Sequence, residues 1–362
     1  MTEKYPIWYD TDGDMMKKKL LLFTAVFLLV TTAFSLISCN NAAPAKYDFF
    51  AMDTHMSIRL YGQSANLAAG GIEGQPEFLD SVLSVTDEES DVYRLNHAKG
   101  ETLTVDNHVA PLIKLSQELC EDLDGYLDFT LYPVSQAWGF TTGDYRIPEQ
   151  AEIDELLQKV DYRRIEADTE TFEVTVPDGM MLDFGAVAKG YAADYATEIL
   201  KNTGTVSGIV DYGGTIIPWG MKNGKDLWTI GIQDPEDPSS YFGILSVTEK
   251  VISTSGGYER YFIGEDGKRY IHIIDPKTGY PVDNGILSVT VVCESGIAAD
   301  ALSTALFVMG TEKAAEFYQN DTKYHFDFLI LDEEKHLYLT EGIADSFTLS
   351  NGYDYSVIRI EK

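Results

Sequence analysis

Cysteine is scarce in this chain, which has only Cys39, Cys120 and Cys293 among its 362 residues. The last two lie far apart in the sequence, so they do not indicate a disulfide framework. Basic residues are also few, since 27 Lys and Arg stand against 58 Asp and Glu and give a net charge of −31. Nucleic acids and anionic lipids attract basic surfaces, so this charge argues against both as partners of the folded protein.

Several short motifs of common enzymes are absent as well. The sequence contains no His-Glu-x-x-His, no paired Cys-x-x-Cys and no Gly-x-Ser-x-Gly. These motifs supply zinc ligands or a nucleophilic serine, so zinc hydrolase and serine-triad chemistry drop out. Apolar residues, in contrast, make up 44% of the chain and aromatic residues 12%, which is enough to bury a sizeable core in one or two domains.

The N-terminal segment resembles an export signal. Three lysines at 17–19 precede an almost purely apolar run at 20–37, as in the basic and apolar regions of a secretory signal. The run ends in Leu-Ile-Ser-Cys at 36–39, which resembles the bacterial lipobox, where the signal is cut before the cysteine and its thiol carries a diacylglycerol. The alternative is an uncut transmembrane anchor, because a run of this length is close to the minimum that spans a bilayer.

Both interpretations export the rest of the chain. Residues 1–14 are acidic and do not fit a signal, so we interpret them as an extension before a start at Met15 or Met16. The expected organisation is a signal peptide over 1–38, a lipidated Cys39 with a short tether over 39–46, and a folded domain over 47–362. Acylated Cys39 would anchor the protein in the lipid bilayer, on the extracytoplasmic face of a bacterial cell membrane.

The apolar spacing of the remaining chain predicts helices and strands in an irregular order. Helices are expected at 77–83, 108–122, 188–201, 297–309 and 313–318, and the Gly-, Ala- and Ser-rich stretch 62–75 is expected to be a loop. Strands are expected at 47–61, 207–217, 228–233, 242–246, 251–254, 269–274 and 287–292, with a hairpin over 162–176. Because no regular alternation of strand and helix recurs, an α+β architecture is favoured over a doubly wound sheet.

The run Met-Leu-Asp-Phe-Gly-Ala-Val-Ala-Lys-Gly-Tyr at 181–191 has the pattern of a strand end, a Gly turn and a helix start. Such a junction directs backbone N–H groups and the positive end of the helix dipole toward a bound anion, which suits phosphate. Lys189 would add a point charge for a pyrophosphate. The alternative is an ordinary loop with Asp183 at its turn.

The run Gly-Ile-Ala-Ala-Asp-Ala-Leu-Ser-Thr at 296–304 predicts the first turns of a helix on which Asp300 and Thr304 share one face. A carboxylate and a hydroxyl suit Mg²⁺, which keeps several waters and takes further ligands from substrate phosphates. The alternative is structural, because an Asp near a helix start favours the dipole and a helical Thr often bonds the carbonyl four residues back.

Three further strands end in turns. His272 lies in the alternating run 270–274, which leads into an Asp-Pro-Lys-Thr-Gly turn. Its imidazole titrates near neutrality and suits a general base, although a lone histidine in a strand is more often structural. Ser-Thr-Ser-Gly-Gly at 253–257 could bind phosphate or merely close a hairpin, and Asp-Tyr-Gly-Gly at 211–214 allows the backbone to approach a ligand closely.

Taken in order, these runs resemble the ApbE family of flavin transferases, which use FAD to place FMN on proteins. The resemblance rests on MLDFGAVAKGYAAD, DYGG, STSGGYERYF, HIIDPKTGYPV and AADALSTALFVMG, preceded by AMDT at 51–54, the segment 84–96 and Asp-Phe-Thr at 128–130. It implies a single α+β catalytic unit, related to the T-fold, with two lobes and a central FAD cleft. It also implies Mg²⁺-dependent transfer of FMN from FAD to a Ser or Thr hydroxyl of an exported flavoprotein, with release of AMP.

The resemblance also implies roles for individual residues. Those implied for catalysis are His272, Lys189 and Asp183. Those implied as metal ligands are the side chains of Asp300 and Thr304 and the carbonyl of Ala186. Those implied to bind FAD are Met52, Trp138, Gly139, Asp183, Lys189, Ser255, Gly256 and Ile273.

The partner of such an enzyme would be an acceptor protein with a Ser/Thr-Gly-Ala-Ser/Thr-like signature. No such run occurs in this chain, which favours the enzyme over the acceptor. Two residues depart from the family's common pattern, namely Asp211 in place of Asn and Thr215 in place of Asp, and they bear on FAD affinity more than on the fold. Two other functions stay open: a Mg²⁺-dependent FAD pyrophosphatase that releases FMN and AMP, and a non-catalytic FAD-binding lipoprotein.

Overall fold

The structure, a computed structural model, describes residues 43–204 and 207–362. The predicted signal peptide, Cys39 and residues 40–42 of the predicted tether therefore lie outside the described residues. In the part that is described, none of the helices has the length and apolar character needed to cross a membrane. Residues Ala45–Lys362 form one compact unit.

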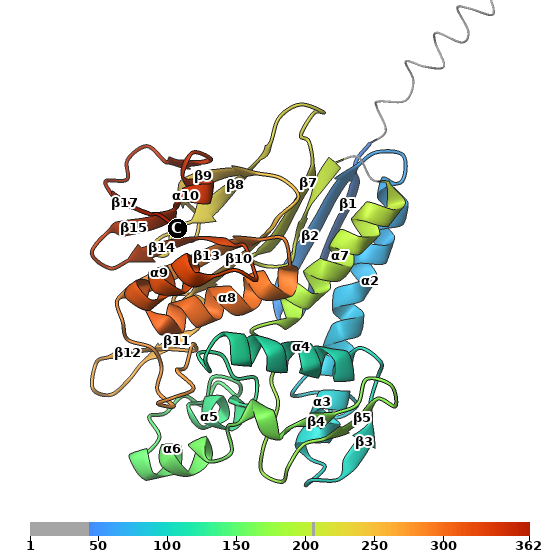
Figure 1. Cartoon of the computed structure of the whole chain (residues 1–362), viewed down its shortest axis with the longest axis vertical. Helices are drawn as coiled ribbons and strands as arrows, with labels where there is room; N and C mark the ends of the chain where they lie inside the picture. The colour runs from blue at the N-terminus through green and yellow to red at the C-terminus, as the bar shows by residue number, and fades with distance from the viewer. Residues whose placement is uncertain (1–42, 205–206) are drawn as a thin grey trace, which may run out of the picture. The chain divides into compact units, whose positions relative to one another are not determined.

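A sheet of nine strands runs through this unit, in the order β1-β2-β6-β7-β10-β13-β14-β15-β17 (Figure 1). Neighbouring strands are antiparallel, except that β15 and β17 are parallel. The strands are β1 Ala45–Ala51, β2 Thr54–Tyr61, β6 Ser207–Asp211, β7 Thr215–Gly220, β10 Val251–Gly256, β13 Ile286–Cys293, β14 Asp327–Asp332, β15 His336–Thr340 and β17 Ser356–Ile360. Strand β13, the sixth in this order, is buried along nearly its whole length, because both faces of the sheet are covered there.

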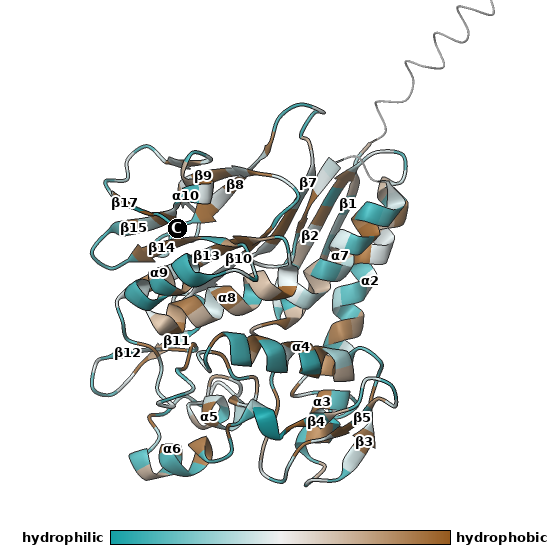
Figure 2. Ribbon diagram, viewed as in Figure 1, coloured by the Kyte–Doolittle hydropathy of each residue, from teal (hydrophilic) through white to brown (hydrophobic). Residues whose placement is uncertain are grey.

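Helices cover one face of the sheet. They are α2 Ala65–Leu83, α7 Ala188–Thr203 and α8 Gly296–Met309, with α9 Thr311–Asn320 beside α8. Their apolar sides and the strands beneath them form the main hydrophobic core. Figure 2 shows hydrophobic residues along the strands of the large sheet, whereas α4 and α9 present hydrophilic residues to the viewer. This difference follows from burial, because the strands lie in the core whereas α4 and α9 each keep one side exposed. Helix α8, in contrast, is buried on almost every side.

A smaller sheet covers the opposite face. It consists of β16 Phe347–Leu349, β9 Tyr241–Val247 and β8 Trp228–Gln233, in that order. Residues of β8 alternate between buried and exposed, the pattern of a strand with one face in a core. Its buried residues pack with those of β10, β13, β14 and β15 in a second hydrophobic core.

Shorter elements form a layer below the large sheet in Figure 1. They are α3 Asp91–Asn96, α4 Val109–Asp122, α5 Tyr132–Ala137, α6 Gln150–Leu157, a 3₁₀ turn at Tyr162–Arg164, and a small sheet of β3 Thr102–Thr104, β5 Glu173–Thr175 and β4 Glu166–Ala167. The two-stranded ribbon of β11 Tyr261–Ile263 and β12 Arg269–Ile271 packs on α5 through a third, aromatic core. A short helix, α10 Glu341–Ala344, follows β15.

The α+β prediction is confirmed, and most predicted elements occur within a few residues of their expected bounds. Four predictions were wrong. The stretch 62–75 is mostly helix α2 and not a loop, because Ala65, Ala68, Ala69 and Ile72 give it a buried face. The stretches 47–61 and 207–217 are each a hairpin of two strands and not one strand. Strand 269–274 ends at Ile271, so His272 lies just beyond β12.

Candidate functional site

Two glycines allow α7 and α8 to cross in close contact. A Cβ on Gly190 would lie 2.3 Å from the carbonyl oxygen of Gly296, and a Cβ on Gly296 would lie 2.4 Å from the carbonyl oxygen of Gly190. Only glycine therefore fits at either position. Asp194 of α7 reinforces the crossing, because its carboxylate accepts the backbone N–H groups of Gly296 and Ile297 at the start of α8. The crossing joins the predicted phosphate loop to the predicted metal-binding helix.

Asp300 of α8 lies against the first turn of α7. Its Oδ2 accepts the backbone N–H of Gly190 at 2.9 Å, and its Oδ1 accepts the hydroxyl of Ser253 at 2.9 Å. In a regular helix the N–H of Gly190 would donate to the carbonyl of Ala186, four residues earlier. Within the described residues, no hydrogen bond to that carbonyl is found. Asp300 thus takes the donor and leaves the Ala186 oxygen available to a cation.

Thr304 lies one turn further along α8 and is the one residue of that helix that is not fully buried. Its hydroxyl is 3.2 Å from that of Ser255 on β10, and the Ser255 hydroxyl is 2.8 Å from that of Ser303. Ser255, which the sequence predicts to bind FAD, therefore contacts a predicted metal ligand. Its contact with FAD stays a prediction.

Asp183 is held by the backbone just before α7. Its N–H donates to the carbonyl of Phe129 at 2.8 Å, and its Oδ1 accepts the N–H of Gly185 at 2.8 Å. Asn96 clamps the preceding residue, because its side chain accepts the N–H of Leu182 at 2.6 Å and donates to the Leu182 carbonyl at 3.0 Å. The family resemblance includes the segment 84–96, but the sequence predicts no role for Asn96. Its partner Leu182 is 86 residues away, so no local pattern reveals the contact.

Carboxyl groups gather around Lys189. Burial raises the pKa values of Asp211, Glu259 and Asp300, and the positive charge of Lys189 opposes the rise in each case. Burial also raises the pKa of Asp183. A divalent cation bound among these groups would also oppose this rise in pKa, because positive charge favours the ionised carboxylate.

His272 has the tautomer that suits a base. Its backbone N–H donates to the carbonyl of Arg260 at 3.0 Å, and its Nδ1 lies 3.1 Å from the same oxygen. A carbonyl only accepts, so we assign the proton to Nδ1 and a free lone pair to Nε2. Burial lowers the pKa of His272 to about 4, and the charges of Arg260 and Lys189 act in the same direction. The imidazole is therefore neutral at pH 7.

Met52 lies in the turn between β1 and β2. Met52 and Asp53 have φ values of 48° and 58°, the left-handed pair of a type I′ hairpin turn. Methionine is unfavourable in this conformation, and such strain is common at functional sites. Gly213 packs against the same turn, because a Cβ there would lie 2.2 Å from Oγ1 of Thr54. The AMDT and DYGG segments therefore lie side by side at one end of the sheet.

The two departures from the family pattern have partners in the structure. Oδ1 of Asp211 accepts the N–H groups of Gly213 at 2.9 Å and Gly214 at 3.3 Å, which an asparagine oxygen would accept equally. Thr215 is fully buried, and its hydroxyl lies 3.2 Å from that of Ser253.

Four predicted FAD contacts also have structural roles. Trp138 is fully buried and donates its indole N–H to the carbonyl of Gly279 at 2.9 Å. Gly139 has a φ of 83°, and a Cβ there would lie 2.3 Å from the carbonyl oxygen of Asp144. The carbonyl of Ile273 accepts the N–H of Val282 at 2.9 Å. Gly256 is buried, and a Cβ there would lie 2.3 Å from the ring of Tyr258. Their contacts with FAD stay predictions.

The donor set around Asp300 fits Mg²⁺. The described residues contain no group of three or more His, Cys, Asp or Glu side chains that could hold a metal ion. A cation here would rely on the carboxylate of Asp300, the neutral oxygens of Thr304 and Ala186, and oxygens of water or a bound phosphate. An all-oxygen set completed by water and phosphate suits Mg²⁺, whereas zinc sites are rich in nitrogen and sulfur ligands.

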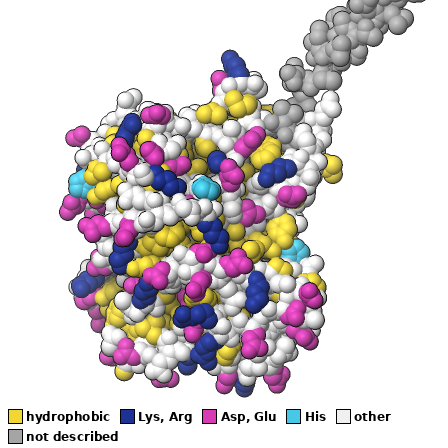
Figure 3. Space-filling model, viewed as in Figure 1, with side chains coloured by type: hydrophobic (Ala, Val, Ile, Leu, Met, Phe, Trp, Pro, Cys, Tyr) yellow, Lys and Arg dark blue, Asp and Glu magenta, His cyan; other side chains and the backbone are white. Residues whose placement is uncertain are grey.

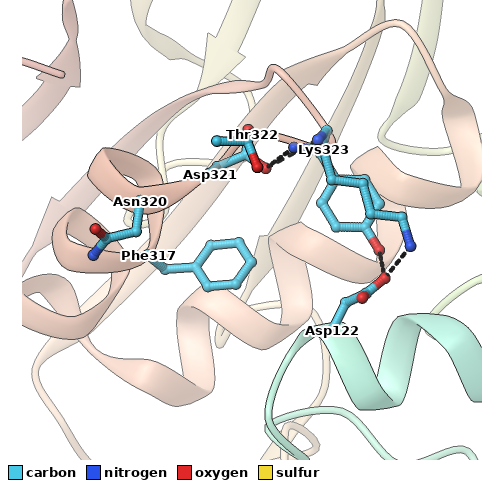
Figure 4. A pocket seen from close by; sticks show the side chains of 7 residues that line it. Asp122, Phe317, Asn320, Asp321, Thr322 and Lys323 are labelled. Atoms are coloured by element: carbon cyan, nitrogen blue, oxygen red, sulfur yellow. Dashed lines mark hydrogen bonds and ion pairs between the residues drawn. The ribbon is translucent and has the colours of Figure 1, made fainter.

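A cavity of about 190 Å³ lies elsewhere, at the end of α9. None of the predicted site residues lines it (Figure 4). Its polar groups satisfy one another, because Asp122 accepts from Lys323 and from the Tyr324 hydroxyl, and Asp321 accepts three backbone N–H groups. On the face shown in Figure 3, acidic and basic side chains are scattered, and hydrophobic ones gather between the upper and lower parts.

Comparisons with known proteins agree with the sequence motifs. The ApbE family model matches residues 52–328. A protein of Klebsiella pneumoniae (strain 342) named FAD:protein FMN transferase is 32% identical over 270 residues, which cover 74% of this chain and 83% of that protein. A protein of the same name from Escherichia coli (strain K12) is 30% identical over 319 residues, which cover 83% of this chain and 90% of that protein.

Solved structures give the same result. The crystal structure of the ApbE protein of Thermotoga maritima has a TM-score of 0.77 and 34% identity, and the match covers 84% of this chain and 99% of that one. The apo form of the flavinyl transferase ApbE of Pseudomonas stutzeri has a TM-score of 0.70 and 29% identity, covering 80% of this chain and 92% of that one. The family match over most of the chain and the shared fold lead to one conclusion: this chain belongs to the ApbE family.

Proposed function

We propose that the protein is a Mg²⁺-dependent FAD:protein FMN transferase. In this reaction a Ser or Thr hydroxyl of an acceptor protein attacks the phosphorus on the FMN side of FAD. The new bond joins the acceptor oxygen to that phosphorus, and the bond to the AMP oxygen breaks, so AMP leaves. Support comes from relatives named FAD:protein FMN transferase at about 30% identity over most of the chain.

The observation that carries the proposal is the arrangement at the start of α7. Asp300 accepts the N–H of Gly190, and the carbonyl of Ala186 has no donor among the described residues. Two oxygens of different kinds thus lie beside the helix start that Lys189 flanks. Helix starts and lysine side chains bind phosphate, and the paired oxygens suit the cation that accompanies it.

Mg²⁺ bound to Asp300, Thr304 and the Ala186 carbonyl would supply charge stabilisation for the phosphate oxygens. Lys189 would hold the negative charge of the pyrophosphate in an otherwise acidic protein. Asp183, fixed by its contacts with Phe129 and Gly185, would orient the ligand from the adjoining loop.

His272 would remove the proton of the acceptor hydroxyl. Its Nε2 keeps a lone pair because Nδ1 lies against the Arg260 carbonyl, and its low pKa keeps it unprotonated at neutral pH. A low pKa also makes it a weak base. The negative charge of bound FAD would raise that pKa toward neutrality, so base strength would increase when the substrate is present.

We also propose that the protein is exported and attached to the bacterial cell membrane through acylated Cys39. The basic residues at 17–19, the apolar run at 20–37 and the Leu-Ile-Ser-Cys motif support this location. The acceptor is then an exported flavoprotein with a Ser/Thr-Gly-Ala-Ser/Thr-like signature.

Mass spectrometry tests the activity. The protein is incubated with FAD, Mg²⁺ and a peptide that carries the acceptor signature. The expected result is a gain in peptide mass of one FMN less one water, with AMP released in equal amount, and loss of both products on chelation. A control peptide with Ala in place of the acceptor hydroxyl residue should gain no mass.

Two other outcomes would contradict the transferase. Metal-dependent release of free FMN and AMP, without peptide modification, would make the protein an FAD pyrophosphatase in which water takes the place of the hydroxyl. Bound FAD with no product would make it a non-catalytic FAD-binding lipoprotein.

A further inference from the structure

Strand β10 presents two serines to the helix that carries the predicted metal ligands. Ser253 and Ser255 are two residues apart, so their side chains are on the same face of β10. That face meets α8, where Ser253 donates to Asp300 at 2.9 Å and Ser255 lies 3.2 Å from Thr304. Each side-chain ligand of the proposed cation thus has its own serine partner on the strand.

The spacing of the two elements explains this match. Two residues of a strand advance about 6.6 Å. Four residues of a helix advance about 6 Å. A strand that lies along a helix can therefore keep hydroxyls in register with helix positions four residues apart, and positions 300 and 304 are such a pair.

The direction of the hydrogen bonds can be derived at Ser253. A serine hydroxyl has one proton, and the carboxylate of Asp300 only accepts, so that proton points to Oδ1 of Asp300. The hydroxyl of Thr215, 3.2 Å away, must then donate to Ser253. The series of hydrogen bonds therefore runs from Thr215 through Ser253 to Asp300, and Thr215 and Ser253 are both buried.

Asp300 is thereby held at both oxygens. Ser253 donates to Oδ1, and the backbone of Gly190 donates to Oδ2. These donors on both oxygens fix the plane of the carboxylate. Groups that orient a metal ligand from behind commonly change metal affinity 10- to 100-fold when removed.

We propose that Ser253 and Ser255 are positioning residues that orient Asp300 and Thr304 toward the cation. The inference rests on the proposed function, because it requires that Asp300 and Thr304 bind Mg²⁺. Neither serine needs to touch the cation or FAD for this role. Ser253 acts through the carboxylate, and Ser255 acts through the threonine hydroxyl.

The affinity of the full-length protein for Mn²⁺, measured by electron paramagnetic resonance, tests the proposal without any turnover. Mn²⁺ takes the same oxygen ligands as Mg²⁺. The Ser253→Ala variant should bind Mn²⁺ about 10- to 100-fold more weakly than the wild type, as expected for loss of a group that orients a ligand. Ser255→Ala should also bind more weakly, and Ser253→Thr, which keeps a hydroxyl, should recover most of the affinity.

The matched control is Thr254→Val on the same strand. Thr254 faces the other way, and its hydroxyl pairs with that of Thr290 at 2.9 Å. This variant also loses a hydroxyl but should bind Mn²⁺ as the wild type does. Thermal unfolding of every variant checks that it folds, and Ser255→Ala carries the test if Ser253→Ala does not fold.

The outcomes separate the inference from the proposed function. Unchanged Mn²⁺ affinity in both serine variants, or an equal loss in Thr254→Val, would overturn the positioning role and leave the cation site intact. A wild-type protein that binds no Mn²⁺ would overturn the cation site itself and the inference with it. Weaker binding in the serine variants alone would establish the role.

Discussion

Gly190 and Gly296 touch so closely that a Cβ on either would lie within 2.4 Å of the other's carbonyl oxygen. The two helices can approach to this distance only without side chains at the crossing. The same approach lets the N–H of Gly190 reach Oδ2 of Asp300. Packing and ligand geometry are therefore one feature at this position.

Gly190→Ala should destabilise the protein by about 3 kcal/mol, at the upper end of overpacking costs, because the new Cβ meets backbone that cannot move aside easily. It would also lie 2.6 Å from Cβ of Asp300. Urea unfolding measures the free energy change. A variant as stable as the wild type would contradict the close crossing.

Gly70→Ala is the matched control for that measurement. Gly70 is exposed inside α2, and a Cβ there meets nothing within 4 Å. Alanine is the better helix former, so this variant should be more stable by about 0.5–1 kcal/mol.

Asp300→Asn should remove the response to Mg²⁺ and leave the fold intact. An asparagine at this position can accept from Gly190 and donate to Ser253, and it avoids burying a charge. Without Mg²⁺ the variant should unfold at the wild-type temperature or slightly above. Mg²⁺ at a hundred times its dissociation constant should stabilise the wild type by about 2.7 kcal/mol and the variant not at all. Calorimetric scans with and without Mg²⁺ give both values, and an equal rise in both proteins would exclude Asp300 as a ligand.

His272→Gln should lower the transfer rate by about 10²- to 10⁴-fold, the usual contribution of a general base, and leave FAD binding unchanged. Glutamine fills similar space but cannot take a proton at neutral pH. Rates come from peptide mass spectrometry and FAD affinity from flavin fluorescence. A full transfer rate in the variant would remove His272 from the mechanism.

The pH dependence of kcat/KM should carry the low pKa of His272. The base acts only when unprotonated, and its pKa in the folded protein is about 4 instead of the usual 6.5. The value of kcat/KM, which reports on the free enzyme, should therefore stay level as pH falls through 6.5 and decline only near pH 4. An acidic limb centred near 6.5 would show that the imidazole is not desolvated.

Met52→Asn should separate strain from ligand binding. Asparagine tolerates the left-handed conformation at a φ of 48° better than methionine does, so the variant should gain about 0.5–1 kcal/mol of stability. If the Met52 side chain contacts FAD, the dissociation constant of FAD should rise at the same time. The exposed Lys99, with a φ of 52°, offers the control Lys99→Asn, which should gain stability without any change in FAD affinity. Unchanged FAD affinity in Met52→Asn would argue against a role for that side chain.

Periodic patterns predicted the long elements of this fold but not its tight turns. Helix α4 was predicted because large apolar residues recur along it with helical spacing, and α7 and α8 were predicted although their buried faces are rich in alanine. Only the last part of α2 was predicted, at 77–83, because its first part mixes small alanines with Gly70, Gly71 and Gly74 and is followed by Pro76. The β1–β2 turn was missed because neither Met52 nor Asp53 is a glycine, and their positive φ values leave no mark in the hydropathy pattern.

The site could be predicted from motifs only as separate segments. The sequence placed Asp300 and Thr304 on one helix face correctly, since that depends on local spacing. Their partners could not be predicted in the same way. Ser253 and Gly190 are 47 and 110 residues from Asp300, and hydrogen bonds between such distant positions follow from the packing of whole elements.

The β1–β2 hairpin sets a distance between the point where the chain enters the folded unit and the turn at Met52. The seven residues of β1, at about 3.3 Å each, span about 23 Å. The Debye length, over which salt screens a charge, is about 8 Å at physiological ionic strength. If Cys39 holds the protein at an anionic bilayer, the turn can therefore lie up to almost three Debye lengths beyond the entry point. At that height the negative potential of the lipid surface is largely screened. If the protein is attached through Cys39 as proposed, anionic FAD near this turn would bind with little repulsion from an anionic bilayer.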